Sequence, residues 1–377
     1  MRTLKRSVAV FMGDWIPYSE TFIYDQLLAH RRYEAHVYAQ GRTSGPAHAG
    51  AANFQRTTIL SRPERWLWRN MRRAPRFSAQ IARQHPAVAH AHFGTNASFA
   101  VPLLERRKIP LVTTFHAHDV EGLLPLHAAT PRYRLYRKGA AELFRVSRLN
   151  LASSRELADV LVKQLGVPAK RVRWHRIGID LSRFTTRTFD SASRVVSMVG
   201  RFVEKKGFEY GIAAFAQLSQ EFPDARLRIA GAGPLLPRYK AVVRQEGLED
   251  CVEFVGPLDH ERVIELLQTS DVFLAPSVTD VQGDREGGLT VVKEASACGL
   301  GIVASYHGGI PEIVEHERTG LLAPERDVKA LAEFLRVMLL DVGARAQFGR
   351  AARMKVEHEY SLTQQIDELE SIFDEVS

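Results

Sequence analysis

Short apolar runs that alternate with segments of helical length are the feature that most limits what this chain can fold into. In the first half, runs rich in β-branched residues occupy residues 8–12, 35–39, 88–92, 111–115, 149–153 and 171–177. The same alternation begins again after residue 189, with apolar runs at residues 195–199, 227–230, 252–255, 272–275 and 302–304. Amphipathic stretches such as residues 208–222 and 261–269 lie between these runs. Strands alternating with helices form parallel sheets covered on both faces, so the pattern predicts doubly wound α/β domains.

Two such series indicate two domains. The chain has 377 residues, whereas a single hydrophobic core rarely grows beyond about 250–300 residues. The charge divides at the same place, because residues 1–189 carry 31 basic and 12 acidic side chains and residues 190–377 carry 20 and 31. We therefore predict an N-terminal domain over residues 1–185, a polar hinge over residues 180–193 and a C-terminal domain over residues 190–360.

The last segment, residues 361–377, is predicted to be a helix with one apolar stripe. Its apolar residues recur at spacings of three and four: Leu362, Ile366, Leu369, Ile372 and Phe373. Such a stripe must be buried, and we expect the helix to cross back and pack on the N-terminal domain. Two facing Rossmann-like domains bind ligands at the carboxyl ends of their strands, so functional residues are expected in the loops after strands.

Composition excludes several classes of protein. Apolar residues make up 45% of the chain and charged residues 25%, which excludes a disordered chain. Cys251 and Cys298 are too few for a disulfide framework and show no metal-ligand spacing. The N-terminus lacks the pattern of a signal peptide, and no run of about 20 apolar residues occurs. We expect a cytoplasmic protein whose membrane contact, if any, is peripheral to the inner face.

A pair of glutamates seven residues apart is the strongest motif. Glu286 and Glu294 follow the run at residues 272–275, and Gly287 and Gly288 are expected to open a helix that Gly299 closes. Free amides at such a helix start bind anions such as phosphate. The carboxylates would repel a phosphate, so they are expected to accept hydrogen bonds from sugar hydroxyls. For an isolated pair, two solvated glutamates would be the simpler interpretation.

A second motif follows the run at residues 195–199. Gly200 and Arg201 are followed by Lys206, and an arginine and a lysine across a tight loop can converge on one diphosphate. Glycines after two neighbouring runs, at Gly231, Gly233 and Gly256, would let the backbone approach a planar ring. Solvated basic residues and ordinary strand-end turns explain these features about equally well when each is taken alone.

The motifs in this order resemble the retaining glycosyltransferases of family 4, which have the two-domain GT-B fold. The markers are the Glu286 and Glu294 pair, GRFVEKKG at residues 200–207, GGIPE at residues 308–312 and TGLLAP at residues 319–324. In the first half, YSETFI at residues 18–23 and HAHFGTNAS at residues 90–98 look like the branch that builds colanic acid and related exopolysaccharides.

The resemblance implies roles for the donor-binding residues. Arg201 and Lys206 would hold the diphosphate of a UDP- or GDP-linked sugar, Glu286 would face the hexose and Glu294 the ribose. Leu289 stands where that branch often has proline. The complete donor-binding set implied is Gly13, Gly200, Arg201, Lys206, Gly231, Gly233, Val255, Gly256, Leu258, Glu286, Gly287, Gly288, Leu289, Thr290 and Glu294.

In the first domain, His116 follows the run at residues 111–115 and matches the family histidine that lies over the donor sugar. Ala117 replaces the usual glycine. The residues expected to contact the acceptor are Glu20, Thr21, His118 and Asp119. His90 and His92 alternate along their strand and are expected to face covered surfaces.

The resemblance also implies a mechanism. His116, Glu286, Arg201 and Lys206 form the predicted catalytic set, in which the leaving phosphate accepts the acceptor proton and configuration is retained. Asp280 and Asp284 raise the question of a divalent metal, but the family uses no such site, so we expect neither metal nor cofactor.

Three other classes remain as alternatives. A nucleotide-sugar epimerase would need acid/base carboxylates on both sides of the hexose. A dinucleotide-dependent oxidoreductase would need a third glycine where Leu236 stands. A basic nucleic-acid-binding protein would need a recognition module, whereas the excess of basic residues is confined to the first half.

Residues 61–77 combine six arginines with Trp66, Leu67, Trp68, Met71 and Phe77. Arginine and tryptophan together suit the surface of an anionic membrane, which a lipid-linked acceptor would favour. We expect Arg62, Arg65, Arg69, Arg72 and Arg73 to carry this contact. The alternative is an arginine-rich surface with both tryptophans in the core.

Overall fold

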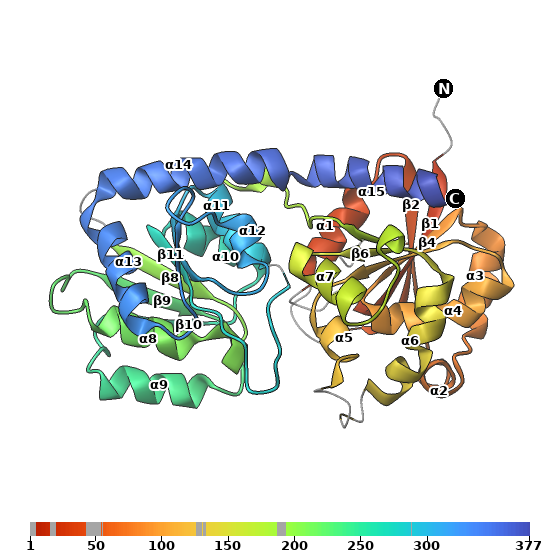
Figure 1. Ribbon diagram of the computed structural model, residues 1–377, viewed down its shortest axis with the longest axis horizontal. Helices are drawn as coiled ribbons and strands as arrows, with labels where there is room; N and C mark the ends of the chain where they lie inside the picture. The colour runs from red at the N-terminus through yellow and green to blue at the C-terminus, as the bar shows by residue number, and fades with distance from the viewer. Residues whose placement is uncertain are drawn as a thin grey trace. The chain divides into compact units, whose positions relative to one another are not determined.

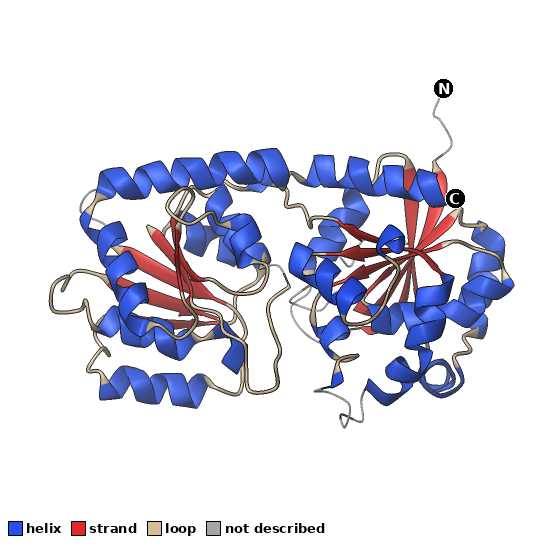
Figure 2. Ribbon diagram, in the orientation of Figure 1, coloured by secondary structure: helices blue, strands red, loops and turns tan. Residues whose placement is uncertain are grey.

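The computed structural model describes residues 5–15, 20–42, 54, 56–125, 130, 133–186, 194–287 and 289–377. They divide into two units, Met1–Gly178 with Leu362–Ser377 and Ile179–Ser361, so the chain passes between the units twice. Each unit is a parallel sheet with helices on both faces (Figures 1 and 2), which confirms the predicted α/β class. Residues 187–193 of the predicted hinge, together with Tyr18, Ser19 and Gly288 of the motifs, lie outside the described residues.

The first unit contains a seven-stranded sheet in the order β3-β2-β1-β4-β5-β6-β7. Its strands are β1 (Arg6–Trp15), β2 (Tyr33–Arg42), β3 (Thr57–Ile59), β4 (Val88–His92), β5 (Leu111–Phe115), β6 (Ser147–Ala152) and β7 (Val172–Trp174). Its helices are α1 (Thr21–Ala29), α2 (Arg62–Met71), α3 (Pro75–Gln84), α4 (Gly94–Arg106), α5 (His118–Glu121), α6 (Arg134–Val146), α7 (Arg155–Lys163) and α15 (Leu362–Val376).

Strand β1 shows why helices must cover both faces of this sheet. Val8, Val10 and Met12 pack with α1 and α15, whereas Ala9 and Phe11 pack with α3 and α4 on the opposite face. Side chains alternate between faces along a strand, and here both faces are apolar. Solvent and ligands therefore reach this strand mainly at its ends.

The second unit contains a six-stranded sheet in the order β10-β9-β8-β11-β12-β13. Its strands are β8 (Val195–Val199), β9 (Arg226–Ala230), β10 (Val252–Gly256), β11 (Val272–Ala275), β12 (Gly301–Ser305) and β13 (Leu321–Ala323). Its helices are α8 (Phe208–Ala216), α9 (Leu236–Gln245), α10 (His260–Gln268), α11 (Thr290–Ala297), α12 (Ile310–Ile313), α13 (Val328–Leu340) and α14 (Val342–Glu359).

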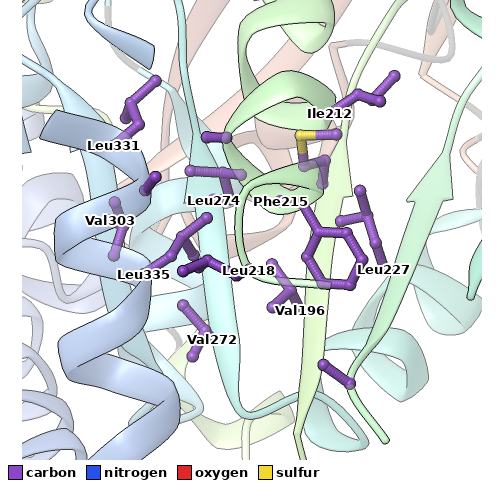
Figure 3. Packing of buried hydrophobic residues seen from close by; sticks show 14 of the residues in the cluster. Val196, Ile212, Phe215, Leu218, Leu227, Val272, Leu274, Val303, Leu331 and Leu335 are labelled. Atoms are coloured by element: carbon purple, nitrogen blue, oxygen red, sulfur yellow. The ribbon is translucent and has the colours of Figure 1, made fainter. Parts of the chain in front are cut away.

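The core of the second unit has the same two-sided pattern. Val272 and Leu274 of β11 point toward α8 and α13, where Phe215 and Leu335 meet them (Figure 3). Phe273 points the other way and packs with α10, α11 and α14. Burying a large apolar side chain contributes about 1.5–3 kcal/mol, so these alternating residues fix the register of the strand.

Three elements differ from the sequence-based prediction. Strands β3 and β13 were not predicted, because each has three residues and lies at a sheet edge, too short to show a period. The helix predicted over residues 208–222 ends at Ala216, and the remaining residues form turns before Pro223. Leu218 and Phe222 still pack into the same core, so the apolar pattern is satisfied without a longer helix.

Helix α15 packs in the first unit against α1 and the sheet, as its apolar stripe predicts. One buried carboxylate, Glu370, fixes it there: its oxygens accept main-chain amides of Arg31, Arg32 and Tyr33 at 2.9, 3.0 and 3.2 Å. His30 Nδ1 lies 3.1 Å from the same carboxylate. Burial alone would raise the pKa of Glu370, but these hydrogen bonds outweigh it and lower the pKa to about 2.

This low pKa makes the docking of α15 sensitive to acid. The unfolded chain has the ordinary pKa of 4.5 and the folded chain one of about 2, so the carboxylate contributes about 3 kcal/mol that is fully present above pH 4.5 and lost as pH falls toward 2. We expect Glu370→Gln to lower the unfolding free energy by about that amount at pH 7. Denaturant unfolding at a series of pH values measures it. Glu368→Gln, exposed on the same helix, is the control, and equal stability of the two variants would contradict the prediction.

Candidate active site

The strand order of each sheet identifies where a ligand would bind. The order reverses between β1 and β4 in the first unit and between β8 and β11 in the second. Loops at such reversals diverge and leave room for a ligand at the carboxyl ends of the strands. Gly13 lies in β1, two residues before its carboxyl end, while Arg201 follows β8 and Glu286 follows β11 in the second unit. The predicted residues therefore cluster at these two positions, one in each unit.

In the first unit, Asp119 has a different place from the one predicted. Its carboxylate is fully buried and accepts main-chain amides from His116 at 2.9 Å and from Gly94 at 2.6 Å. It thereby ties the end of β5 to the start of α4. A carboxylate used in this way has no surface for an acceptor, so Asp119 is removed from the predicted acceptor contacts. His118, beside it, is half-buried and contacts Phe93.

His116 is half-buried and rests on a second histidine. Its Nε2 lies 3.3 Å from Nδ1 of His92, and the two rings are stacked. His90, two residues earlier, places Nε2 2.8 Å from the Thr114 hydroxyl. Burial lowers the pKa of both His90 and His92 well below the usual value, so both rings are neutral. The expectation that these two histidines face covered surfaces is confirmed.

The backbone after β5 explains why a glycine is usual at position 117. Ala117 has φ of +90°, a region that residues with a side chain rarely adopt. Phe22 in α1 lies against His116 at 5.3 Å between ring centroids. Glu20, the N-cap residue of α1, and Thr21 directly precede Phe22 and remain predicted acceptor contacts.

In the second unit, Lys206 and Glu286 form an ion pair. Nζ of Lys206 lies 3.1 Å from Oε1 of Glu286, and both side chains are nearly buried. Burial lowers the pKa of Lys206 although Glu286 opposes this, while the neighbouring lysines outweigh burial and lower the pKa of Glu286. Arg201 is exposed. The residues predicted to hold the diphosphate and the hexose thus lie side by side.

The glycine-containing loops after β9 and β10 are in contact. Gly231 donates its amide to the Gly256 carbonyl at 2.8 Å, which joins two of the loops predicted to border the nucleobase. At Gly231, with φ of +146°, a Cβ atom would lie 1.9 Å from the Gly200 carbonyl oxygen. Glycine is therefore required here by the neighbouring main chain, whether or not a ring also binds. Val255 is half-buried and Leu258 packs in a small apolar cluster.

Helix α11 begins later than predicted. It runs over Thr290–Ala297, with Leu289 as its N-cap residue, so Gly287 precedes the helix and does not open it. Leu289 is buried and no side chain of a described residue caps the helix start. The first amides of α11 remain a predicted anion site.

Glu294 is held by two residues that the sequence did not reveal. Nε2 of His260 lies 2.8 Å from Glu294 Oε1, and Nδ1 of His260 lies 2.9 Å from Nη1 of Arg183. An arginine only donates, so Nδ1 accepts and Nε2 carries the proton that is donated to Glu294. Arg183 lies 77 positions before His260, and Glu294 lies 34 positions after it. No local sequence motif could therefore have linked the three residues.

Asp280 is used within its own loop. Its carboxylate accepts the main-chain amides of Gln282 and Asp284, both at 2.9 Å. This is an Asx turn, a common arrangement for an aspartate in a tight loop. The turn accounts for the local acidic pattern without any ligand.

Comparison with known proteins gives a family match for each unit. Residues 25–183 match the family described as Glycosyltransferase Family 4, and residues 184–355 match the family described as Glycosyl transferases group 1. A protein of Escherichia coli K12 named as a colanic acid biosynthesis glycosyltransferase, WcaL, is 37% identical over 276 residues, which is 72% of this chain and 66% of that protein. The amylovoran biosynthesis glycosyltransferase AmsK of Erwinia amylovora is 34% identical over 275 residues, which is 72% of this chain and 65% of that protein.

The matched region spans about two thirds of the length of these relatives. Among solved structures, HepE from Anabaena in complex with UDP and glucose has a TM-score of 0.79 at 19% identity, over 98% of this chain and 100% of that one. At that identity the likeness concerns the fold alone. It confirms the two Rossmann-like domains predicted from the sequence.

The contact between His260 and Glu294 can be tested by substitution. His260→Ala removes the donor from a buried carboxylate, and we expect it to lower the unfolding free energy by about 1–3 kcal/mol. His260→Gln keeps an amide donor near Nε2 and should recover most of this loss. Denaturant unfolding measures both, with Glu265→Gln, an exposed residue of the same helix, as the control. Wild-type stability of His260→Ala would show that the contact contributes nothing.

Proposed function

The chain belongs to the glycosyltransferases of family 4 and group 1, and we propose that it transfers a hexose from a nucleoside-diphosphate sugar to a saccharide acceptor with retention of configuration. We place this reaction in the synthesis of a bacterial exopolysaccharide or other cell-surface glycan. Relatives named for colanic acid and amylovoran biosynthesis support that setting. UDP in the complex of HepE supports a nucleoside diphosphate as part of the donor, which in this chain is UDP- or GDP-linked.

The observation that carries the proposal is the Lys206–Glu286 pair at the strand reversal of the second unit. A buried cation there can stabilise the charge of a leaving diphosphate, and Arg201 in the same loop adds a planar fork of donors. A carboxylate beside them can accept a sugar hydroxyl. This combination fits a donor that has a diphosphate directly bonded to a sugar.

The proposed reaction is one front-face displacement. The bond between the anomeric carbon and the diphosphate oxygen breaks, and the acceptor hydroxyl oxygen bonds to that carbon from the same face. The leaving phosphate takes the acceptor proton, so no protein base is required. Arg201 and Lys206 stabilise the leaving group, Glu286 and His116 orient the sugar, and Glu294 binds the ribose.

A panel of UDP- and GDP-linked sugars tests this proposal. We expect one donor to be bound and slowly hydrolysed, and His116→Ala and Glu286→Ala each to lower turnover by about 100-fold or more while the nucleoside diphosphate still binds. Glu249→Ala, exposed and remote in sequence from the motifs, is the control. Wild-type turnover in both variants would refute the mechanism, and epimerisation of the donor without transfer would favour an epimerase.

We further propose that the acceptor is lipid-linked and that α2 contacts an anionic membrane. Arg62, Trp66 and Arg69 recur along one side of this helix, Arg73 follows its C-terminal cap, and all four are exposed, Trp66 to 60%. Trp68 is buried, so one of the two tryptophans is a core residue. No described helix is long and apolar enough to cross a bilayer.

Arg72 does not belong to this surface. It pairs with Glu142 of α6 at 2.6 Å and donates to the Ser98 carbonyl. Its guanidinium therefore joins α2 to α6 and α4, which corrects the expectation from the sequence. The proposed basic surface consists of Arg62, half-buried Arg65, Arg69 and Trp66 of α2, together with Arg73 just after the helix.

Liposome flotation tests the membrane contact. Each basic residue near an anionic surface contributes about 1 kcal/mol, so changing the four arginines to glutamine should weaken binding to anionic vesicles about a thousandfold. The control removes four exposed charges elsewhere in the same unit: Arg83, Arg106, Lys108 and Arg148. Equal binding of the two variants would reject α2 as the contact, while donor hydrolysis should be unchanged in both.

A further inference from the structure

A chain of buried contacts runs from Glu325 through His307 to the main chain of Glu286. Nδ1 of His307 lies 2.6 Å from Oε1 of Glu325, and the Glu286 amide donates to Nε2 of His307 at 3.1 Å. The His307 side chain is fully buried. These residues follow three strands that are neighbours in the sheet, β11, β12 and β13, so their carboxyl ends bring the residues together.

The hydrogen bonds determine the state of the His307 ring. Because Nε2 accepts the Glu286 amide, it carries no proton, and Nδ1 carries the proton that is donated to Glu325. Burial lowers the pKa of His307 below its usual 6.5, and Arg285 acts in the same direction, although Glu325 and Glu286 oppose them. The ring is therefore neutral near pH 7.

Glu325 also binds Thr279, at the start of the loop over residues 279–287 that ends near Glu286. Its carboxylate accepts the Thr279 amide at 2.8 Å and the Thr279 hydroxyl at 3.1 Å. Burial alone would raise the pKa of Glu325, but the hydrogen bonds from His307 and Thr279 outweigh it and lower the pKa. One carboxylate thus joins the start of the loop to the histidine that holds its end.

The residues after His307 enclose the main chain of Glu286 from the other side. The Gly309 amide donates to the Glu286 carbonyl at 3.1 Å. Gly308 has φ of +52°, and a Cβ atom there would lie 2.2 Å from the same carbonyl oxygen. Residues 307–309 therefore bind both the amide and the carbonyl of Glu286. These contacts fix the position of its main chain.

We propose that His307 is a positioning residue for Glu286, with Glu325 holding the ring in the required tautomer. The inference rests on the proposed function, in which Glu286 orients the donor sugar. His307 acts through the main chain and does not touch the substrate. A carboxylate displaced by about 1 Å from its productive position can lose on the order of 100-fold in rate, so such support bears directly on turnover.

Two substitutions separate the two hydrogen bonds of the ring. His307→Gln places an amide oxygen near the Nε2 position, where it can accept the Glu286 amide. His307→Asn places an amide nitrogen near the Nδ1 position, where it can donate to Glu325 but leaves the Glu286 amide unbound. We expect Asn to lower kcat by about 10- to 100-fold with the nucleoside diphosphate Kd changed less than about threefold, and Gln to restore kcat to within about fivefold of wild type.

The pH profile gives a readout that a merely structural role would not change. Protonation of His307 places a hydrogen on Nε2 and removes the acceptor of the Glu286 amide, so wild-type kcat should fall as pH drops through the lowered pKa of the ring. The Gln variant has no imidazole to protonate, while Glu325 and Glu286 are unchanged, so it should lack the acidic limb that belongs to His307. Equal loss of kcat in the Gln and Asn variants, or wild-type kcat in the Asn variant, would overturn the inference.

Hydrogen exchange separates failure of this inference from failure of the proposed function. Exchange of the amides in residues 279–287 should be faster in His307→Asn than in His307→Gln, whatever reaction the protein performs. If the wild type transfers no sugar and Glu286→Gln behaves like it, the proposed function fails while this comparison still tests the loop. Equal exchange rates in both variants would show that His307 does not hold the loop.

Discussion

Burial of both faces of two parallel sheets is the constraint on which the rest of this structure depends. Alternating side chains of β1 and β11 enter apolar cores on opposite sides, so neither strand offers a polar surface along its length. Ligand chemistry is left to the carboxyl ends, and the reversals at β1/β4 and β8/β11 select which ends diverge. The same rule places Gly13, Arg201 and Glu286 without reference to what they bind.

The charge of the second half makes the local arrangement necessary. Residues 190–377 carry 20 basic and 31 acidic side chains, so the general field of that segment opposes an anionic donor. In the proposed function, attraction comes from local groups, namely Arg201, Lys206 and the first amides of α11. In the Lys206–Glu286 pair, the carboxylate opposes the lowering of the Lys206 pKa by burial. The acidic neighbour thus favours the charged form of the lysine.

Much of the fold follows from the sequence, because runs of four or five residues such as those of β4, β5, β8 and β11 are long enough to be recognised as strands. The three-residue strands β3 and β13 are not, and only pairing with a neighbour defines them. Lys206 and Glu286, each singled out from a motif within one loop, lie together in the structure, whereas the contacts of His260 and His307 were not foreseen. Each histidine meets its partners from other strands or helices, and a single sequence does not show such pairs. Asp119 was placed with the acceptor because its position after a strand is the same for a ligand contact and for a main-chain contact.

The buried polar residues at the strand ends share a function other than ligand binding: they hold the main chain in place. Asp119 holds the amides of His116 and Gly94, and His307 holds the amide of Glu286. A buried polar group is costly unless it is paired, and pairing it with the main chain converts that cost into a fixed backbone position. His116 and Glu286 are themselves partly exposed and so remain able to meet a ligand. Each unit therefore separates the two tasks, with a fully buried side chain setting the backbone and its neighbour in the fold left to do the chemistry.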